Sequence, residues 1–254
     1  MTDRIQREKD FHNQRFAEDT RKPLDKYYSI TANTRRFFLD LMNDELKGKT
    51  VLEYGCGTGS FSFDLAEKGA IVYGIDISEV AIEEAKKISA TKNFKENLNF
   101  FVMNAEDLKF ENDFFDRVCG NSILHHLDLR ASLKELTRVL KREGNAIFIE
   151  PLGHNPFINL YRKLTPKLRS KDEHPLKSED LKLFKEYFSE VNINYFHLTT
   201  LLSVPFRNTT LFDEIFSILS KTDSALFKFE IFKKNAWMIV LEMSGPKKIF
   251  IKSI

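Results

Sequence analysis

The sequence predicts an α/β fold in which parallel strands alternate with helices, and three observations support this. Five short apolar or β-branched segments follow one another at steady intervals between residues 50 and 151. Helix-like segments stand between them, and this alternation is typical of a parallel sheet with right-handed crossovers. The composition, 42% hydrophobic and 30% charged over 254 residues, is that of a soluble globular protein long enough for one large domain.

The first 45 or so residues predict an amphipathic helical arm. Phe11, Phe16 and Phe38 are among its apolar anchors, and Pro23 is expected to divide the arm into two helices.

The predicted elements of the central part then follow in order. The strands are TVLEYG (50–55), AIVYGID (70–76), LNFFVMN (98–104), FDRVCGNS (115–122) and GNAIFIEP (144–151). The helices between them are FSFDLAEKG, then SEVAIEEAKKISA with Ser78 as its N-cap, then LRASLKELTRVLKREG.

The last third departs from this alternation of strands and helices, because it contains two insertions, 152–177 and 201–235. Between them come a helix, SEDLKLFKEYF, and a strand, VNINYFHLTT; the strand AWMIVLEM follows the second insertion. Connections this long in a compact domain are usually lids or binding loops. We predict a single domain over 1–254, made of a helical arm or lid (1–45), a core (46–151), an insertion over the active site (152–177) and a phenylalanine-rich helical insertion (201–235).

Charge and cysteine usage exclude several classes of protein. A net charge of +2 is too balanced to indicate nucleic acid as a partner. Cys56 and Cys119 lie far apart and outside any CxxC pair, which fits a reducing cytosol. The charged N-terminus lacks the apolar core of a signal peptide, and no run approaches the roughly 18 apolar residues that span a bilayer. We therefore expect a cytoplasmic protein without stable membrane insertion.

The stretch VLEYGCGTGSF carries the most specific motif. Gly55, Gly57 and Gly59 follow an apolar run, with Glu53 two places before the first glycine. A phosphate-binding P-loop needs a lysine that is absent, and the dinucleotide fingerprint needs glycine where Ser60 stands. The spacing that fits is an acidic residue followed by Gly-x-Gly-x-Gly. With this motif the sequence resembles the class I S-adenosylmethionine-dependent methyltransferases.

Later segments extend the resemblance over roughly residues 45 to 150. Asp76 closes the second strand, where an acid accepts hydrogen bonds from both ribose hydroxyls. Asn104 stands where the family usually has Asp, and its carbonyl can accept from the adenine amino group while the Ala105 amide donates to the ring. The segments FDRVCGNSILHHL and LTRVLKREGNAIFIEP match the family's next motifs.

This resemblance implies a Rossmann-like, seven-stranded, mostly parallel sheet with an antiparallel last strand and helices on both faces. It implies S-adenosyl-L-methionine as cofactor, with S-adenosyl-L-homocysteine as product. Bare glycine backbone lets the cofactor's amino-acid tail pass, and Glu53 favours its ammonium group, directly or through water. The expected cofactor-binding residues are Tyr28, Glu53, Gly55, Cys56, Gly57, Gly59, Asp76, Ile77, Asn104, Ala105, Glu106 and Asn121.

Methyl transfer from a sulfonium is a displacement that depends chiefly on positioning, and it needs a base only when the acceptor must lose a proton. Asn121-Ser122-Ile123-Leu124 lacks the prolines of DNA base methyltransferases, and we find no glutamate pair like that of protein arginine methyltransferases. We therefore expect transfer to O, N or C of a small organic acceptor.

The catalytic candidates are His126, Glu150 and His154. His125 and His126 follow the fourth strand, where the family's cofactor and acceptor meet, and at least one of them is expected to serve packing. Glu150 ends the fifth strand, where it acts as a base, orients one, or makes a salt bridge. His154 carries an imidazole that can act as a general base, and a purely structural role for it stays open.

Acceptor contacts are predicted for His12, Tyr27, His125, Arg162 and His174. In family members with such an arm, it lies over the cofactor, and Tyr27 or Tyr28 would touch cofactor or acceptor; the alternative is an arm packed on its own core. No Asp/Glu/His spacing supports a metal, so none is predicted.

The phenylalanine-rich insertion places Phe212 and Phe216 at helical spacing, with Thr210 and Asp213 approximating a capping box. A lid over a lipophilic acceptor, a homodimer interface and attachment to a membrane face remain open beside a subdomain folded on itself. Two other functions also remain open: a cofactor-binding, non-catalytic subunit or sensor, and a lipid or quinone methyltransferase.

Overall fold

The fold is seen in a computed structural model, which describes residues 3–18, 29–43, 45–92, 94 and 97–248. Pro23, Tyr27 and Tyr28 lie outside the described residues.

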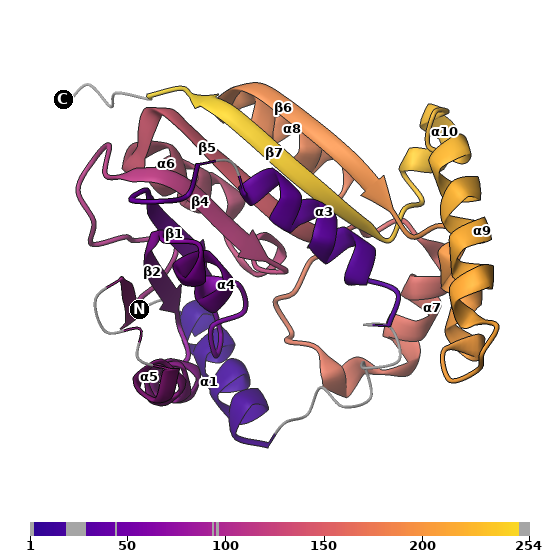
Figure 1. Cartoon of the computed structure of the whole chain (residues 1–254), viewed down its shortest axis with the longest axis horizontal. Helices are drawn as coiled ribbons and strands as arrows, with labels where there is room; N and C mark the ends of the chain where they lie inside the picture. Colours follow the sequence, from indigo (N-terminus) through magenta and orange to yellow (C-terminus); the bar gives the residue numbers. More distant parts are fainter. Residues whose placement is uncertain (1–2, 19–28, 44, 93, 95–96, 249–254) are drawn as a thin grey trace.

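One seven-stranded sheet forms the centre of the molecule (Figure 1). The strands are β1 (Thr50–Tyr54), β2 (Ile71–Asp76), β3 (Leu98–Val102), β4 (Phe115–Asn121), β5 (Leu140–Pro151), β6 (Phe188–Phe196) and β7 (Met238–Pro246). Their order is β3-β2-β1-β4-β5-β7-β6. Strands β1 to β5 pair in parallel, whereas β7 runs antiparallel to both β5 and β6. The predicted mostly parallel sheet with an antiparallel last strand is confirmed.

Helices cover both faces of this sheet. The α-helices are α1 (Asp3–Glu18), α3 (Ala32–Met42), α4 (Ser62–Glu67), α5 (Glu79–Lys92), α6 (Leu129–Val139), α7 (Pro156–Leu164), α8 (Ser178–Tyr187), α9 (Phe212–Leu226) and α10 (Glu230–Lys233). Three 3₁₀ turns are η2 (Leu124–His126), η3 (Pro166–Leu168) and η4 (Thr200–Phe206). Figure 1 shows α3 in front of the sheet and α8 behind it. None of the described helices combines the length and the apolar character needed to cross a membrane.

The two faces carry separate hydrophobic cores because side chains alternate along each strand. In β1, Val51 packs on the side of α3, α4 and α5, and Leu52 and Tyr54 pack on the side of α6 and α8. A central strand that is apolar on both faces is what a parallel sheet covered by helices requires.

Two local predictions need correction. The helix predicted to reach residue 144 ends at Val139, because Leu140 is extended, fully buried and paired with Phe115 at the start of β5. Helix α9 begins at Phe212 without a side-chain cap, so the proposed Thr210 capping box is wrong. The first insertion is partly helical, since it forms α7 and η3.

Candidate active site

Two cavities lie at the carboxyl ends of the parallel strands. The first, the glycine-turn cavity, has a volume of about 300 Å³. Its lining includes Arg4, Glu8, His12, Phe16, Gly55, Cys56, Gly57, Asp76, Ile77, Asn104, Ala105, Glu106, Asn121, Ser122 and His126. The second, the arginine cavity, has a volume of about 440 Å³ and lies next to it. Its lining includes Phe11, Arg15, Arg35, Asn121, Ser122, His125, His126, Ile158, Tyr161, Arg162, Leu168, Arg169, Glu173 and Trp237.

The two cavities share part of their walls. Asn121 is the last residue of β4, Ser122 follows it, and His126 lies in the turn η2 after them. All three residues line both cavities. Arg15 of α1 also lines both. A ligand in one cavity would therefore lie beside a ligand in the other, at the sheet edge where open α/β folds bind ligands.

The glycine turn is shaped by close approach of neighbouring side chains. Gly55 and Gly57 have positive φ angles of 59° and 54°, which a residue with a Cβ rarely adopts. A Cβ on Gly55 would lie 2.8 Å from Ile123 Cδ1, and one on Gly57 would lie 3.0 Å from the Phe16 ring. The turn thus presents bare backbone to the cavity, as the resemblance implies.

Asp76 fixes this turn through a hydrogen bond. Its Oδ2 accepts a hydrogen bond of 2.9 Å from the Gly57 amide, and its Oδ1 accepts one of 2.8 Å from the Ser78 amide. Asp76 is buried, yet it lines the cavity. A carboxylate has about four acceptor positions, so both oxygens can still accept hydroxyl donors from a ligand.

Glu53 does not line the glycine-turn cavity. It is fully buried, and its Oε1 accepts a 2.9 Å hydrogen bond from the Phe61 amide while its Oε2 accepts from the Ser62 hydroxyl. Burial raises its pKa to about 7, although the bonds from Ser62 and Phe61 act in the opposite direction. The structure thus places Glu53 at the start of α4 instead of at the cofactor's expected ammonium group. Gly59 is also absent from the lining, since it packs over Phe63.

The segment after β3 forms the wall expected to face adenine. The Asn104 side chain accepts a 3.1 Å hydrogen bond from the Glu106 amide. The Glu106 carboxylate accepts from Arg4 Nη2 at 2.5 Å and from the Asp128 amide at 2.9 Å. Arg4 belongs to α1, so this wall is joined to the N-terminal helix.

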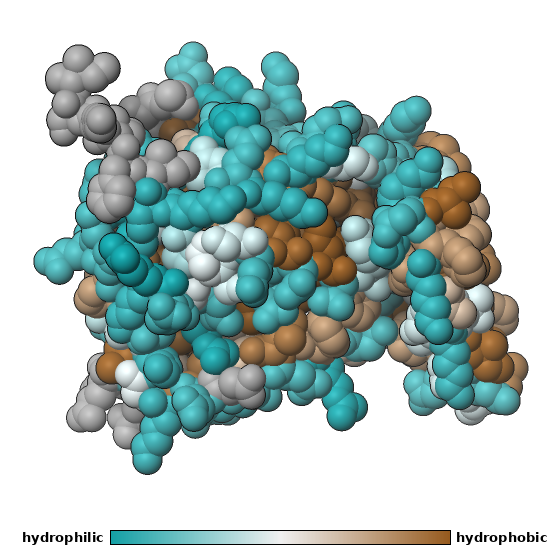
Figure 2. Space-filling view, turned by 90° about the horizontal axis from the view of Figure 1, so that it is seen from above, coloured by the Kyte–Doolittle hydropathy of each residue, from teal (hydrophilic) through white to brown (hydrophobic). Residues whose placement is uncertain are grey.

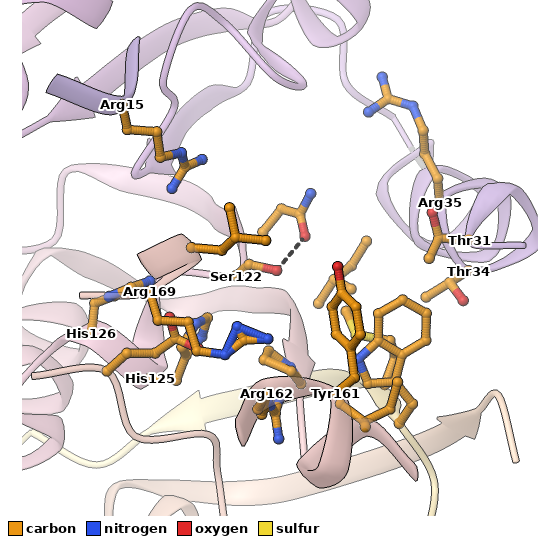
Figure 3. Close-up of a pocket in the computed structure, with 18 of the residues that line it drawn as sticks. Arg15, Thr31, Thr34, Arg35, Ser122, His125, His126, Tyr161, Arg162 and Arg169 are labelled. Carbon is orange, nitrogen blue, oxygen red and sulfur yellow. Dashed lines mark hydrogen bonds and ion pairs between the residues drawn. The ribbon is translucent and has the colours of Figure 1, made fainter. Parts of the chain in front are cut away.

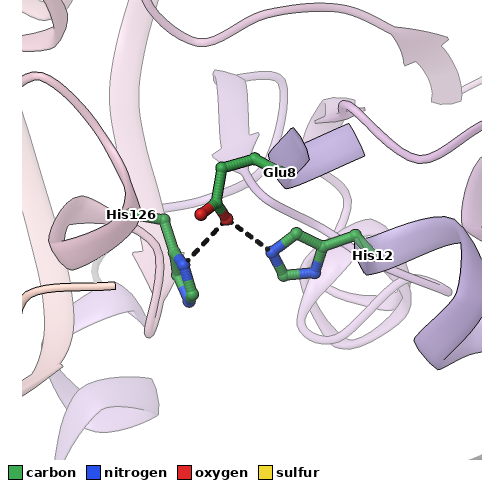
Figure 4. Close-up of side chains that lie close together, drawn as sticks. All are labelled: Glu8, His12 and His126. Carbon is green, nitrogen blue, oxygen red and sulfur yellow. Dashed lines mark ion pairs between the residues drawn. The ribbon is translucent and has the colours of Figure 1, made fainter. Parts of the chain in front are cut away.

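Helix α1 closes the glycine-turn cavity through a buried glutamate between two histidines (Figure 4). Glu8 Oε2 is 3.1 Å from His126 Nδ1 and 3.5 Å from His12 Nε2, and Ser170 donates a 2.5 Å bond to Glu8 Oε1. Burial alone would raise the pKa of Glu8, but the bonds from His12, His126 and Ser170 outweigh it and hold the pKa below its ordinary value. Because His126 and Ser170 lie outside α1, their contacts with Glu8 hold the helix over the cavity, and the His12 ring lies beside that of His126.

A second buried acid–histidine pair stands behind the arginine cavity. His125 Nδ1 is 2.7 Å from Glu150 Oε2, while Glu150 Oε1 accepts from the amides of Ile123 and Leu124 at 2.9 and 2.8 Å. Burial raises the pKa of Glu150 to about 8, although the hydrogen bonds from the amides of Leu124 and Ile123 act in the opposite direction. Glu150 lines neither cavity, so of the roles left open for it, the geometry fits orientation of His125.

The first insertion brings Tyr161 and Arg162 to the arginine cavity. Asn155 caps α7, because its side chain accepts bonds of 3.1 and 3.0 Å from the amides of Phe157 and Ile158. Figure 3 shows Tyr161, Arg162 and Arg169 gathered on one wall, opposite Thr31, Thr34 and Arg35.

Two histidines predicted for the site lie elsewhere. The His154 ring accepts a 3.3 Å bond from the Ser178 amide at the start of α8, and it lines neither cavity. His174 is exposed, and only its backbone contributes, through a 2.9 Å bond to the His125 carbonyl. Neither residue lines either of the two cavities, and the catalytic role of His154 and the acceptor contact of His174 remain predictions of the sequence.

Several lining residues escaped the sequence-based prediction, among them Glu8, Arg15, Arg169 and Trp237. The i, i+4 spacing of Phe11 and Arg15 on one helix is a weak signal for one shared face. Trp237 carries no local signal, because it reaches the site from the bend before β7, far along the chain from β4 and α7.

Two histidine–carboxylate groups have the donor types of a metal site. They are Glu8 with His12 and His126, and His125 with His126 and Glu173; within each group the nearest ligand atoms lie within 4.8 Å. Each group joins two residues of one element, Glu8 with His12 or His125 with His126, to a third residue that is distant in the sequence, so spacing along the chain does not reveal the whole group.

The phenylalanine-rich insertion does not line either cavity. Leu202, Leu211, Ile218, Phe229 and Ile231 are exposed, and Figure 2 shows apolar side chains at the end of the molecule where α9 and α10 lie. Asp223 fixes α9, because it accepts from the amides of residues 198, 199 and 200. A lid over the acceptor is therefore not the use that this geometry supports.

Residues 45–192 match the family described as "Methyltransferase domain". The demethylmenaquinone methyltransferase of Lactococcus lactis is 36% identical over 123 residues, covering 47% of this chain and 48% of that protein. The aklanonic acid methyltransferase DauC of a Streptomyces species is 35% identical over 124 residues, covering 46% and 56%. The chain thus spans about half the length of these curated relatives.

The fold also resembles solved structures. A phosphoethanolamine N-methyltransferase 2 of Haemonchus contortus, in complex with phosphomonomethylethanolamine and S-adenosylhomocysteine, superposes with a TM-score of 0.64 at 18% identity. The match covers 91% of this chain and 59% of that one.

Proposed function

The chain belongs to the methyltransferase-domain family, and we propose that it transfers a methyl group from S-adenosylmethionine to O, N or C of a small organic acceptor. The observation that supports this proposal best is that two cavities lie side by side and share a wall formed by Asn121, Ser122 and His126. The names of the curated relatives, which act on demethylmenaquinone and aklanonic acid, support a small organic acceptor.

The residues of the glycine-turn cavity fit the cofactor. Gly55 and Gly57 offer bare backbone for its amino-acid tail, and a Cβ at either position would collide with a neighbour. Asp76 has acceptor capacity for the ribose hydroxyls, and Asn104 and Ala105 line the wall for the adenine. When bound, S-adenosylmethionine supplies a methyl group on a sulfonium.

The acceptor is assigned to the arginine cavity, with His125 as the base when a proton must leave. Glu150 lies 2.7 Å from Nδ1 of His125 and orients the ring, which lines the arginine cavity. Glu150 is then a positioning residue. His126, a catalytic candidate in the sequence, instead contacts Glu8 of α1 and separates the two cavities.

The test of this function is calorimetry with S-adenosylmethionine and S-adenosylhomocysteine. We expect micromolar binding, and Asp76→Ala should weaken it at least tenfold, a loss of about 1.4 kcal/mol. Asp107→Ala is the matched control, because Asp107 is exposed and pairs only with Lys109 among the described residues. Asp76→Asn separates the charge from the hydrogen bonds to the turn. Absence of binding by the unmodified protein at millimolar ligand would reject the proposed function.

A cytoplasmic location and a homodimer remain predictions of the sequence. Cys56 and Cys119 are both buried free thiols, which is compatible with a reducing compartment.

A further inference from the structure

The arginine cavity carries more positive charge than methyl transfer requires. Four arginines line it, from α1, α3, α7 and the segment after η3, and the lining contains one carboxylate, that of Glu173. Arg35 has its own partners outside the lining, since it pairs with Asp64 and stacks 4.4 Å over the Phe61 ring. Arg15 in turn lies 5.1 Å over the Phe16 ring and 3.3 Å from His12 Nδ1, so the charge considered next is that of Arg162 and Arg169.

The Arg169 side chain has no hydrogen bond to any of the described residues. Its side chain is only 19% exposed, and its nearest counter-charge is Glu173, whose Oε1 lies 3.9 Å from Nε and thus beyond hydrogen-bond distance. Nε itself is buried and unsatisfied within the described part of the chain. A guanidinium taken out of water without partners is costly, so this position is poised for an acceptor group from a ligand.

Arg162 is held in place by one end of its guanidinium and leaves the other end available. Nη1 donates to the Leu152 carbonyl at 3.1 Å and to Asn159 Oδ1 at 3.0 Å, whereas Nε and Nη2 have no partner among the described residues. Burial lowers the pKa of Arg162 to about 10, with Arg169 acting in the same direction and Glu173 against it. One carboxylate thus faces two guanidinium groups, and a second anion would balance them.

The rest of this wall is apolar or aromatic. Ile158, Tyr161, Leu168 and Trp237 line the cavity together with the two arginines, while His125 and His126 mark the side next to the glycine-turn cavity (Figure 3). A ligand that fills the cavity therefore meets cations and a hydrophobic surface.

We propose that the acceptor is an amphipathic anion, with a carboxylate or phosphate group bound by Arg162 and Arg169 and an apolar body packed on Trp237. That the anion is the methyl acceptor rests on the proposed function, whereas the anion site itself is a property of the arginine cavity. Arginine forks match planar oxyanions and bind them with charge-assisted hydrogen bonds, so the site discriminates against neutral analogues.

Trp237 provides the readout, because it is the chain's only tryptophan and it lines the cavity. Its fluorescence is titrated with hexanoate, hexyl phosphate and hexan-1-ol, with and without saturating S-adenosylhomocysteine. At least one of the two anions should bind at least tenfold more tightly than the alcohol, and the tighter one identifies the oxyanion. Equal binding of the alcohol and both anions would overturn the proposal.

Substitutions of single arginines test whether the anion binds in the arginine cavity. Arg169→Met is the primary one, because the Arg169 side chain makes no hydrogen bond to the described residues and is 3.9 Å from its counter-charge, Glu173. It should weaken anion binding at least tenfold and leave alcohol binding unchanged; Arg162→Met should act in the same direction. Arg130→Met, an exposed arginine paired with Glu186, is the control. If Arg130→Met lost as much affinity as Arg169→Met, or if neither cavity variant lost any, the anion site would be rejected.

The two proposals fail separately. If S-adenosylhomocysteine does not bind, the proposed function fails while the titrations without it still judge the anion site. If it binds and the anions show no preference, only the anion site fails.

Discussion

At the scale of single residues, Glu53 shows how one motif residue serves the fold. It follows two apolar residues of β1, and the turn that begins after Tyr54 brings the amides of the following helix back onto its carboxylate. Full burial raises its pKa to about 7, so the folded protein holds this proton more tightly than the unfolded chain, whose ordinary value is 4.5. Its protonation therefore stabilises the fold fully below pH 4.5, and this contribution is lost as the pH rises through about 7.

Glu53→Gln should remove this pH dependence. A neutral amide keeps an acceptor for the Phe61 amide, so the variant should gain stability relative to the unmodified protein between pH 4.5 and 7, by up to about 3 kcal/mol. Urea unfolding at pH 5 and pH 8 measures it, with Glu67→Gln at an exposed position of α4 as control. Parallel stability curves for the variant and the unmodified protein would contradict this account.

At the scale of elements, α1 is attached by polar contacts. Glu8 is its only buried residue. Beyond the Glu8 cluster, Arg4 reaches Glu106, Arg7 makes two bonds of 2.8 Å to Asp172, and Lys9 pairs with Glu79. Contacts of this kind hold a helix in place while allowing it to open at modest cost, which suits an element that covers a ligand cavity.

Glu8→Gln should loosen α1. Replacing the buried carboxylate removes the charge that faces His12 and His126, so hydrogen exchange of residues 3–18 should accelerate at least tenfold and S-adenosylhomocysteine should bind more weakly. Glu18→Gln, at the exposed end of the same helix, is the control. Exchange rates unchanged by Glu8→Gln would show that the other contacts suffice.

Acid should have the same effect on the unmodified protein. The pKa of Glu8 is held below its ordinary 4.5, so its contribution is present above pH 4.5 and lost as the pH falls below that value. Exchange in α1 should therefore accelerate on acidification in the unmodified protein and stay flat in Glu8→Gln. An acid response retained by the variant would assign it to other groups.

At the scale of the whole molecule, one sheet joins the arm, the core and both insertions. Strand β5, which ends at Pro151, pairs with β4 from the core and with β7 from beyond the second insertion. Helix α3 of the arm contacts β5 and β7, so the predicted lid region is partly built into the core.

We predict that the chain unfolds in one cooperative transition. A sheet that is continuous from β3 to β6 leaves no boundary at which one part could unfold alone, so calorimetric and van't Hoff enthalpies should agree. S-adenosylhomocysteine at 100 times its dissociation constant should add about 2.7 kcal/mol and move the whole transition upward. Two transitions, with only one responding to the ligand, would show that an insertion folds as a separate unit.

The sequence by itself determined what depends on local order along the chain. Strand periodicity and the glycine spacing were sufficient for the sheet, and the family resemblance added its antiparallel last strand. Most of the cofactor-binding residues that this resemblance implies, such as Asp76 and Asn104, line the glycine-turn cavity. These features are predictable because a strand end and the turn after it form a contiguous unit whose side chains have few directions available.

Only the tertiary structure decided which side chains meet. His125 and Glu150 were both expected at the sheet's carboxyl edge, but their contact depends on β4 and β5 being neighbours in parallel register. His154 has the chemistry of a base, yet the cap that starts α7 leaves it beside α8 instead of the cavity. Arg162 and Arg169 line one cavity together with Trp237, which is distant in the sequence, so only the folded chain brings the charges and the apolar ring together. Residue types and spacing along the chain record the groups that are available, whereas packing sets their distances and their burial, on which binding and catalysis depend.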